Sequence, residues 1–391
     1  MEFTTPFFVI HQNNLDDNFK KLSEALDKHW HNYVIGYSYK TNSLPWVINH
    51  FNDLGCYAEV VSEDEYNLAK YIGQEPSKII YNGPIKSKES FLEALKNRAI
   101  VNVDSQREID WLDEIEPEYK KVGIRVNFDI EKFCLGESQC GEEGGRFGFC
   151  YENGELERAL RKLKDKNCSI NGLHLHTSSN SRSVNIYRAI AKMACRIKEE
   201  FQLDLDYLDI GGGFFGGLAN KPQFDEYFKE VEQILSSGFT KDNTKLVVEP
   251  GMAVVGACIS YVTKVIDVKD TTYNRFVVTD GSRIAIDPLM TKNSYFNEIL
   301  SEQHNDIVHK QVVCGFTCME HDRLFELMDK PALSPGDIII YNKVGAYTMC
   351  LSPLFIKYFP SVYVEDENGS LRQIRKPWTV KDYVQESVFE D

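Results

Sequence analysis

The feature that most constrains the fold of this chain is a regular alternation of short apolar runs with amphipathic stretches. Eight runs have the length and β-branched character of buried strands, and they are 33–39, 57–61, 78–81, 99–103, 121–127, 170–176, 206–210 and 244–249. Stretches with helical periodicity separate them, at 44–54, 63–72, 87–97, 105–115, 153–165, 183–201 and 223–236. Alternating strands and helices build a parallel sheet, and eight strands close a (β/α)8 barrel of the TIM type. An open, doubly wound sheet is the alternative.

The sequence changes character after Gly256. A helix with an apolar period is predicted for 14–30, ahead of the first strand, and the segments Ser62 to Glu65 and Ser105 to Glu108 match the capping-box pattern. Beyond the barrel the apolar runs are short and often alternate with polar residues, at 259–268, 275–279, 312–313, 337–341 and 361–364. We therefore predict an α/β chain with a barrel over 15–256. A β-rich domain, similar to a sandwich or barrel, is predicted for 257–391, joined by residues 1–14 with a strand at 7–10.

Charge and cysteine usage exclude several classes of protein. The chain has 44 basic and 59 acidic side chains, so its formal charge is 44 − 59 = −15, which disfavours nucleic acid and anionic membranes as partners. It has no apolar run of membrane-spanning length and no basic, apolar leader after Met1. The ten cysteines follow no disulfide spacing. We expect a cytoplasmic protein that binds neither nucleic acid nor a membrane.

Reactive and glycine-rich residues gather where the predicted strands end. The carboxyl ends of barrel strands form one face, and the chemistry of such barrels lies there. The residues at these positions are Lys40, Glu59, Arg125, His174, His176, Gly211, Gly212, Gly213, Glu249 and Gly251. A glycine run after the seventh strand lets backbone N–H groups approach a phosphate closely.

These residues meet the requirements of pyridoxal phosphate. A desolvated lysine at a strand end, here Lys40, is a nucleophile toward an aldehyde. The cofactor also needs a phosphate cradle, an acidic partner for its ring nitrogen and a flat group against its ring. We assign Glu249 to the nitrogen, His176 to the ring face and Glu59 to the orientation of Lys40. A solvated lysine in an ordinary loop is the alternative for Lys40.

A metal site is the competing interpretation of His174, His176 and Glu249. Two histidines and one carboxylate form a known iron or zinc set. Successive strand residues point to opposite faces, so His174 and His176 are not expected to converge. We therefore predict no metal.

The chain resembles the fold-type III pyridoxal-phosphate decarboxylases, which include the diaminopimelate, ornithine and biosynthetic arginine decarboxylases and share a barrel with alanine racemase. The similarity covers nearly the whole length. It rests on the stretches Tyr37-Ser38-Tyr39-Lys40-Thr41-Asn42, Glu59-Val60-Val61-Ser62, Arg125-Val126-Asn127, Arg146-Phe147-Gly148-Phe149, Gly172-Leu173-His174-Leu175-His176, Asp209-Ile210-Gly211-Gly212-Gly213-Phe214, Glu249-Pro250-Gly251, Gly315-Phe316-Thr317-Cys318 with Asp322, and Gly345-Ala346-Tyr347.

The resemblance implies a carboxy-lyase of amino-acid metabolism and a head-to-tail homodimer with active sites at the interface. Lys40 holds the cofactor as a Schiff base in such an enzyme, while His176 and Glu249 contact its ring. Ser179, the glycine loop and Tyr347 bind its phosphate. Cys318 of the second subunit reprotonates the carbon from which carbon dioxide has left.

The chain departs from the family pattern at four positions that bear on the cofactor and substrate. Met252 stands where the family has an arginine after Glu-Pro-Gly, and Ser178 replaces a glycine. Met319 replaces the acidic residue after the catalytic cysteine, with Glu320 one place later, and Asp287 replaces an arginine. With Cys318 and Tyr347, these last three form the predicted substrate-binding set.

The departures argue against diaminopimelate, which presents both a distal carboxylate and a distal ammonium. We predict a modified or conjugated amino acid, or a basic or diamino acid other than diaminopimelate. The alternatives are a diaminopimelate, ornithine, lysine or arginine decarboxylase proper, an amino-acid racemase, and a non-catalytic homologue that binds the cofactor or a partner. The loop from Phe128 to Gly145 is either an active-site cover or a mobile connection.

Overall fold

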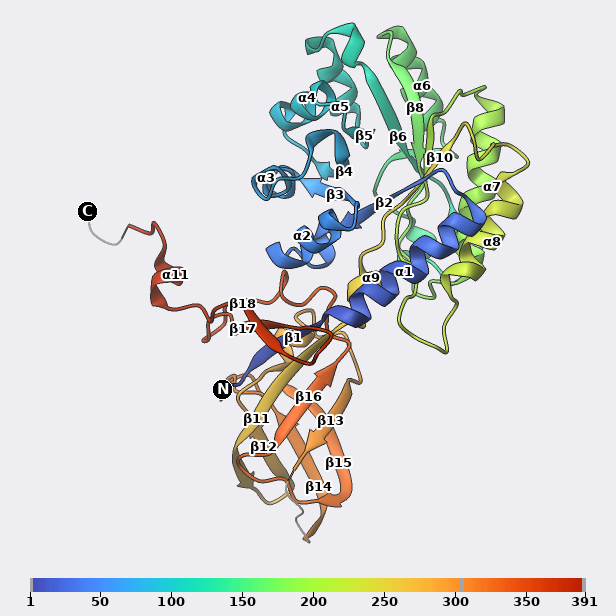
Figure 1. The fold of residues 1–391 in the computed structure, drawn as a ribbon. Coiled ribbons are helices and arrows are strands. Elements are labelled where there is room, and N and C mark those ends of the chain that lie inside the picture. Colours follow the sequence, from blue (N-terminus) through green and yellow to red (C-terminus); the bar gives the residue numbers. More distant parts are fainter. Residues whose placement is uncertain (1–2, 302–305, 389–391) are drawn as a thin grey trace. The chain divides into compact units, whose positions relative to one another are not determined.

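The computed structural model describes residues 3–301 and 306–388. The chain divides into two compact units, one formed by Asn18–Ala253 and the other by Met1–Asp17 with Val254–Asp391 (Figure 1). Within the described residues, no helix combines the length and apolar character that crossing a membrane requires.

The first unit is a closed barrel. In the described part of the chain its eight strands are β2 (Tyr33–Ser38), β3 (Tyr57–Ser62), β4 (Ile79–Ile85), β5 (Ile100–Val103), β6 (Lys121–Asn127), β8 (Ser169–His174), β9 (Tyr207–Asp209) and β10 (Lys245–Val248). Each pairs in parallel with its neighbour, β5 pairs with β6, and β10 returns to β2. The predicted (β/α)8 barrel is thereby confirmed, and the open sheet is excluded. A short strand, β7 (Phe149–Cys150), adds to β6.

Helices follow the strands and lie outside them (Figure 1). They are α1 (Gln12–His29), α2 (Pro45–Asp53), α3 (Glu63–Tyr71), α4 (Lys88–Lys96), α5 (Gln106–Trp111), α6 (Glu155–Asp165), α7 (Val184–Glu200), α8 (Phe224–Leu235) and the single turn α9 (Met252–Val255). Pro45 opens α2, where its missing N–H is not needed.

The two predicted capping boxes form only in part. The Ser62 hydroxyl accepts a hydrogen bond from the Glu65 amide at 3.2 Å, but the Glu65 carboxylate binds the amide of Val61 instead of Ser62. Ser105 caps nothing with its side chain. Glu108 turns instead toward the buried Lys86 ammonium, 3.2 Å away. At this second site, an ion pair between residues far apart in the sequence therefore takes the place of the predicted capping box.

The second unit is a mixed sheet. Its strands are β1 (Phe7–His11), β11 (Ile259–Asp270), β12 (Arg275–Thr279), β13 (Phe296–Leu300), β14 (Ile307–Cys314), β15 (Arg323–Pro331), β16 (Ile338–Asn342), β17 (Ser361–Glu365) and β18 (Leu371–Arg375), with short helices α10 (Arg283–Ile286) and α11 (Val380–Val384). β1 pairs antiparallel with β11 and parallel with β17, so the first residues of the chain belong to this sheet. The sequence predicted neither β13, β15 nor β18, whose side chains are largely exposed and carry little apolar period.

One large side chain, that of Tyr207, occupies a central part of the barrel core. Tyr207 on β9 is buried against Val34, Ile80 and Val247. A Cβ added at Gly123 would lie 2.0 Å from the Tyr207 hydroxyl oxygen, and one added at Gly172 would lie 2.0 Å from its ring carbon Cζ. These two glycines therefore make the space that the tyrosine occupies.

Candidate active site

Lys40 lies at the end of β2. The strand stops at Ser38, and one 3-10 turn, Tyr39–Thr41, carries the lysine. Its ammonium donates to the carboxylate of Glu59, which lies within β3, and is 3.4 Å from the Ser38 hydroxyl. Glu59 is fully buried whereas the Lys40 side chain is about one-third exposed. The lysine is thus held at the mouth of the barrel by an ion pair.

Gly251 lets the end of β10 approach this turn. A Cβ at Gly251 would lie 2.0 Å from the Thr41 hydroxyl oxygen. Only a glycine fits there, and the close approach brings Glu249 to the same edge as Lys40. Gly251 was predicted to contact the cofactor; within the barrel unit it packs on the turn that carries Lys40.

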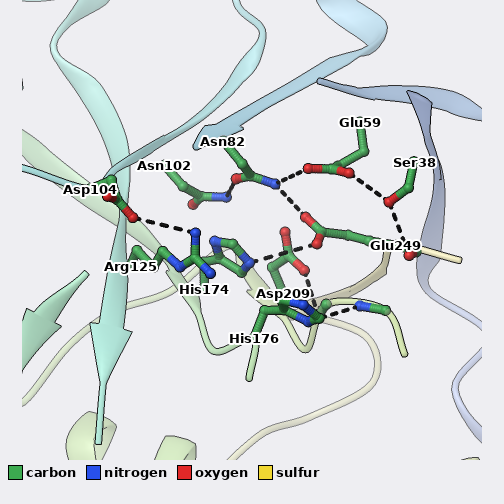
Figure 2. Close-up of polar contacts among 12 residues, drawn as sticks. Ser38, Glu59, Asn82, Asn102, Asp104, Arg125, His174, His176, Asp209 and Glu249 are labelled. Atoms are coloured by element: carbon green, nitrogen blue, oxygen red, sulfur yellow. Dashed lines mark hydrogen bonds and ion pairs between the residues drawn. The ribbon is translucent and has the colours of Figure 1, made fainter. Parts of the chain in front are cut away.

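A buried amide joins the two carboxylates. The Asn82 Nδ2 group, in the middle of β4, donates to Glu59 Oε1 at 3.1 Å and to Glu249 Oε1. Asn102 Nδ2 on β5 donates to Asn82 Oδ1 at 2.8 Å, and the Tyr207 hydroxyl donates to Asn102 Oδ1 at 2.7 Å. Figure 2 shows the two asparagines in line beside the carboxylates. Sequence reasoning missed both; the only available signal was an amide within an otherwise apolar strand.

Burial divides the two acids near His174 into a charged one and a neutral one. Desolvation and the neighbouring Glu249 charge raise the pKa of Asp209 well above its usual range. Desolvation also opposes the charge of Glu249, but His174, Lys40 and a hydrogen bond with Asp209 hold its pKa below the usual range. The Glu249 carboxylate lies 3.7 Å from the His174 Nε2 atom. A permanent negative charge at Glu249 suits a partner for a protonated ring nitrogen.

His174 and His176 do converge. Their rings lie 6.4 Å apart and nearly parallel, at 16°. The prediction that they point to opposite faces was wrong, because only neighbouring residues of an extended chain alternate, and residues two apart, such as these, point to the same face. Desolvation lowers the pKa of His176 to about 3. The ring is therefore neutral at physiological pH and suits contact with a flat aromatic ligand.

The glycine loop after β9 offers fewer free backbone amides to an anion than predicted. The Gly211 amide binds Asp209 at 2.9 Å, and the Gly212 amide lies 3.3 Å from His176 Nδ1. The amide of Gly213 has no hydrogen-bond partner among residues 3–301 and 306–388, and its φ of +91° favours glycine. The Tyr187 hydroxyl fixes the loop by donating to the Gly212 carbonyl at 2.7 Å. One free amide on a rigid loop fits a phosphate oxygen.

Two further predicted cofactor contacts have local partners. The Ser179 hydroxyl accepts from the Arg182 amide at 2.7 Å and so shapes the loop after β8. The buried Arg125 guanidinium lies 3.4 Å from Asp104 and 4.7 Å from the centre of the Phe147 ring. Its Nε atom has no partner among the described residues, so Arg125 keeps a donor for a polar ligand.

The geometry also contains a three-residue group in which metal ligation must be considered. One ligand atom each from His174, Asp209 and Glu249 lies within 4.8 Å of the others. Asp209 already accepts a hydrogen bond from the Gly211 amide at 2.9 Å, and desolvation raises the pKa of its carboxyl, so a proton competes with a cation for this group. The donor set instead fits the organic cofactor that was predicted.

The remaining predicted residues lie in the β-rich unit. Cys318 is exposed, in a loop held by the buried carboxylate of Asp322. Met319 is half-buried, and Glu320 is exposed with its carboxylate 3.6 Å from Arg323. Tyr347 is partly exposed and has a φ of +55°. This backbone conformation is uncommon for a tyrosine and fixes the direction of its side chain.

Asp287, predicted to bind substrate, is buried and engaged in its own unit. Its carboxylate pairs with Arg283 at 3.0 Å and accepts hydrogen bonds from the Tyr295 hydroxyl and the amides of Thr291 and Lys292. Both oxygens are therefore occupied. The geometry favours a structural role for Asp287 over contact with a substrate.

A barrel with a lysine at one strand end and a carboxylate partner at another defines a class of pyridoxal-phosphate enzymes. Residues 13–256 match the family described as "Pyridoxal-dependent decarboxylase, pyridoxal binding domain". The chain belongs to this family, the fold-type III decarboxylases, as its sequence predicted. It is a pyridoxal-phosphate-dependent amino-acid decarboxylase, and the predicted cofactor and enzyme class are confirmed.

Known relatives extend the similarity over the whole chain. A diaminopimelate decarboxylase from Aquifex aeolicus is 28% identical over 385 residues, which cover 96% of this chain and 89% of that protein. The crystal structure of the M. jannaschii diaminopimelate decarboxylase has a TM-score of 0.85 at 21% identity, covering 99% of this chain and 93% of that one. The arginine decarboxylase of Paramecium bursaria Chlorella virus has a TM-score of 0.78 at 21% identity, covering 93% and 96%. These two likenesses show a shared fold.

Proposed function

We propose that this decarboxylase acts on a diamino or basic amino acid, with Lys40 as the residue that binds the cofactor. The observation that carries the assignment is the Lys40 ammonium paired with Glu59, beside the charged Glu249 carboxylate. The relatives named above support diaminopimelate, or a basic amino acid such as arginine, better than they support a conjugated substrate.

When bound, pyridoxal phosphate supplies a ring that accepts electrons from the substrate's α-carbon. The chain's own residues prepare for this. Glu59 orients the Lys40 amine, and Glu249 holds a negative charge for the ring nitrogen. His176 offers a neutral, flat face, and the Gly213 amide and Ser179 are the barrel's donors for the phosphate.

Loss of carbon dioxide leaves a carbon that needs a proton. We assign that proton to the Cys318 thiol, supplied by the second subunit of a homodimer, as the family resemblance implies. A donor at this position distinguishes decarboxylation from racemisation, which returns a proton to the same carbon that lost one and releases no gas.

A second candidate is an amino acid whose far end is neutral or conjugated. Met252 and Met319 bring thioethers to two positions where the family has charged residues, and the Asp287 carboxylate is fully engaged by Arg283 and its neighbours. None of the three offers a charge to the distal end of diaminopimelate. This set of positions favours a substrate without a second charged end.

Carbon dioxide release from a substrate panel separates the candidates. The panel contains diaminopimelate, L-lysine, L-ornithine, L-arginine and amino acids acylated at the far end, with Lys40→Ala and Cys318→Ala assayed alongside. Turnover of a free diamino or basic acid supports the first candidate, and turnover of acylated compounds alone supports the second. Cys318→Ala is expected to slow the reaction by about 10²- to 10⁴-fold, the range for loss of a proton donor. Loss of optical activity without gas would overturn both.

The proposed homodimer has its own test. Mixing the Lys40→Ala and Cys318→Ala variants, each nearly inactive alone, restores activity if each active site takes one residue from each subunit. Random reassortment makes about half of the dimers hybrids, each with one intact site, so roughly a quarter of all sites are intact. No recovery from variants that sedimentation shows to exchange subunits would contradict the shared site.

A further inference from the structure

We propose that Asn82 is a positioning residue that sets the two active-site carboxylates, Glu59 and Glu249, in place together. The inference rests on the function proposed above, in which these carboxylates serve Lys40 and the ring nitrogen. Asn82 lies outside the motifs that carry the family resemblance.

The two hydrogens of one amide group serve different carboxylates. The Asn82 Nδ2 atom is 3.1 Å from Glu59 Oε1 and also donates to Glu249 Oε1 (Figure 2). Glu59 keeps its second oxygen for Lys40 and for the Ser38 hydroxyl at 2.6 Å. A single side chain therefore fixes the separation and orientation of both acids.

The direction of the amide is determined by a chain of donors. Tyr207 has a hydroxyl whose pKa is raised by burial, so it stays protonated and donates to Asn102. Asn102 must then present its NH2 group to the Asn82 oxygen. Asn82 in turn presents its NH2 group to the carboxylates. Reversal of any member would place two acceptors or two donors face to face.

The backbone brings Asn82 to this position through a glycine. Gly83, the next residue, has a φ of +82°, and a Cβ there would lie 2.4 Å from the Val61 carbonyl oxygen. β4 can approach β3 this closely only because Gly83 lacks a side chain. The approach sets Asn82 directly beside Glu59. Gly83 is therefore required for Asn82 to reach this carboxylate.

A neutral donor suits the electrostatics of the site. Lys40 and Glu65 face Glu59, and His174, Asp209 and Lys40 face Glu249. All four members of the cluster formed by Asn82, Asn102, Glu59 and Glu249 are buried. Two buried carboxylates need hydrogen-bond donors to remain charged. A lysine or arginine at this position would neutralise the charges that Lys40 and the ring nitrogen require, whereas an amide stabilises them without competing.

Two isosteric variants test the proposal. Asn82→Leu removes the donor, and Asn82→Asp replaces it with a group that donates only when protonated. The matched control is Gln74→Met, since Gln74 is a buried amide of the same unit whose side-chain NH2 group donates to the carbonyls of Cys56 and Lys78 and, among the described residues, to no carboxylate. For each protein the measurements are the dissociation constant of pyridoxal phosphate and the absorbance of the lysine-linked chromophore from pH 5 to 9, together with the melting temperature.

The two variants are expected to respond to pH in opposite senses. In Asn82→Leu both carboxylates lose a donor and Glu249 protonates more readily, so cofactor affinity falls by about tenfold at pH 7 and its acid limb moves up by about one pH unit. In Asn82→Asp the added carboxyl repels the other two, and affinity improves as the pH falls from 9 to 6. Gln74→Met is expected to lower the melting temperature and leave the pH profile of binding unchanged.

Equal pH profiles in wild type and both variants would overturn the proposal, even if stability fell. A loss of folding in Asn82→Leu leaves the Asn82→Asp profile as the deciding result. Lys40→Ala keeps the test separate from the proposed function. If that variant retained a lysine-linked chromophore, the assignment of Lys40 itself would be wrong; if it lost the chromophore while the Asn82 profiles matched wild type, only the role of Asn82 would fail.

Discussion

The surroundings of two side chains in the site shift their pKa values in opposite directions. Desolvation and the nearby Arg125 and Lys40 charges lower the pKa of His176 to about 3, whereas burial raises the pKa of Glu65 to about 7. An unfolded histidine titrates near 6.5. Between about pH 6.5 and 3 the unfolded chain therefore binds a proton at His176 that the folded chain does not.

This difference predicts an acid weakness specific to His176. Stability that is present above pH 6.5 is lost as the pH falls toward 3, since the unfolded state binds more protons. In the cofactor-free protein, the melting temperature of His176→Gln is expected to fall less than that of wild type when the pH is lowered from 6.5 to 4.5. His31→Gln, at an exposed histidine paired with Asp242, provides the control and keeps the wild-type slope. Parallel slopes in wild type and His176→Gln would contradict the assignment.

The sequence predicted those site residues whose chemistry is visible from position alone. Lys40 and Glu249 are charged residues at the ends of apolar strands and Glu59 is a charged residue within one, and the barrel brings such positions together. Asn82 and Asn102 were missed because an amide inside a strand has no signature of its own. Their roles depend on which neighbour each side chain meets across the barrel, which no local pattern records.

At the level of elements, the loop that carries Cys318 is fixed by one buried carboxylate. Asp322 accepts hydrogen bonds from the Ser282 hydroxyl at 2.8 Å, the Arg283 amide at 2.8 Å, and the Thr317 amide and hydroxyl at 3.1 and 2.6 Å. Gly315 makes this possible, because a Cβ there would lie 2.2 Å from the Asp322 carboxylate. The loop is therefore tied to the start of α10 as well as to itself.

Loosening this loop is expected to impair the proton donor. Asp322→Ala should destabilise the protein by about 2–4 kcal/mol, the loss of several hydrogen bonds to a buried charge, and lower kcat more than it raises KM. The control is Asp337→Ala, which removes another buried carboxylate that binds the Ser334 amide. Steady-state kinetics and denaturant unfolding measure the two effects. Equal kinetic losses in both variants would indicate a general effect of stability.

The strands were largely predictable where both of their faces are buried. All eight barrel strands were found because parallel strands in a barrel read as continuous apolar runs. β13, β15 and β18 were not found, since their exposed side chains depend on pairing partners far along the chain, such as β16 for β13. Caps were the least predictable feature: the Glu65 carboxylate binds the amide of Val61 rather than that of Ser62, and the Glu108 carboxylate pairs with Lys86, a distant partner that a short motif does not reveal.

For the molecule as a whole, the division into a barrel and a β-rich unit predicts an uneven response to the cofactor. A ligand that binds only the folded state stabilises it by about 2.7 kcal/mol at a concentration one hundred times its dissociation constant. Hydrogen exchange should slow mainly in peptides from β2, β3 and β10 on addition of pyridoxal phosphate. Lys40→Ala is the control and should show little slowing. Protection confined to residues 254–391 would contradict a barrel site.

The tyrosine in the barrel interior links three positions that lie far apart in the sequence. Gly123, Gly172 and Tyr207 occupy one shared volume, so a side chain gained at either glycine requires a smaller residue at 207. An alanine at either glycine would clash with the phenol, and a small residue at 207 alone would leave a cavity. A single substitution at any one of these positions therefore lowers the stability of the folded protein. The residues at 123, 172 and 207 are expected to covary among proteins descended from this chain.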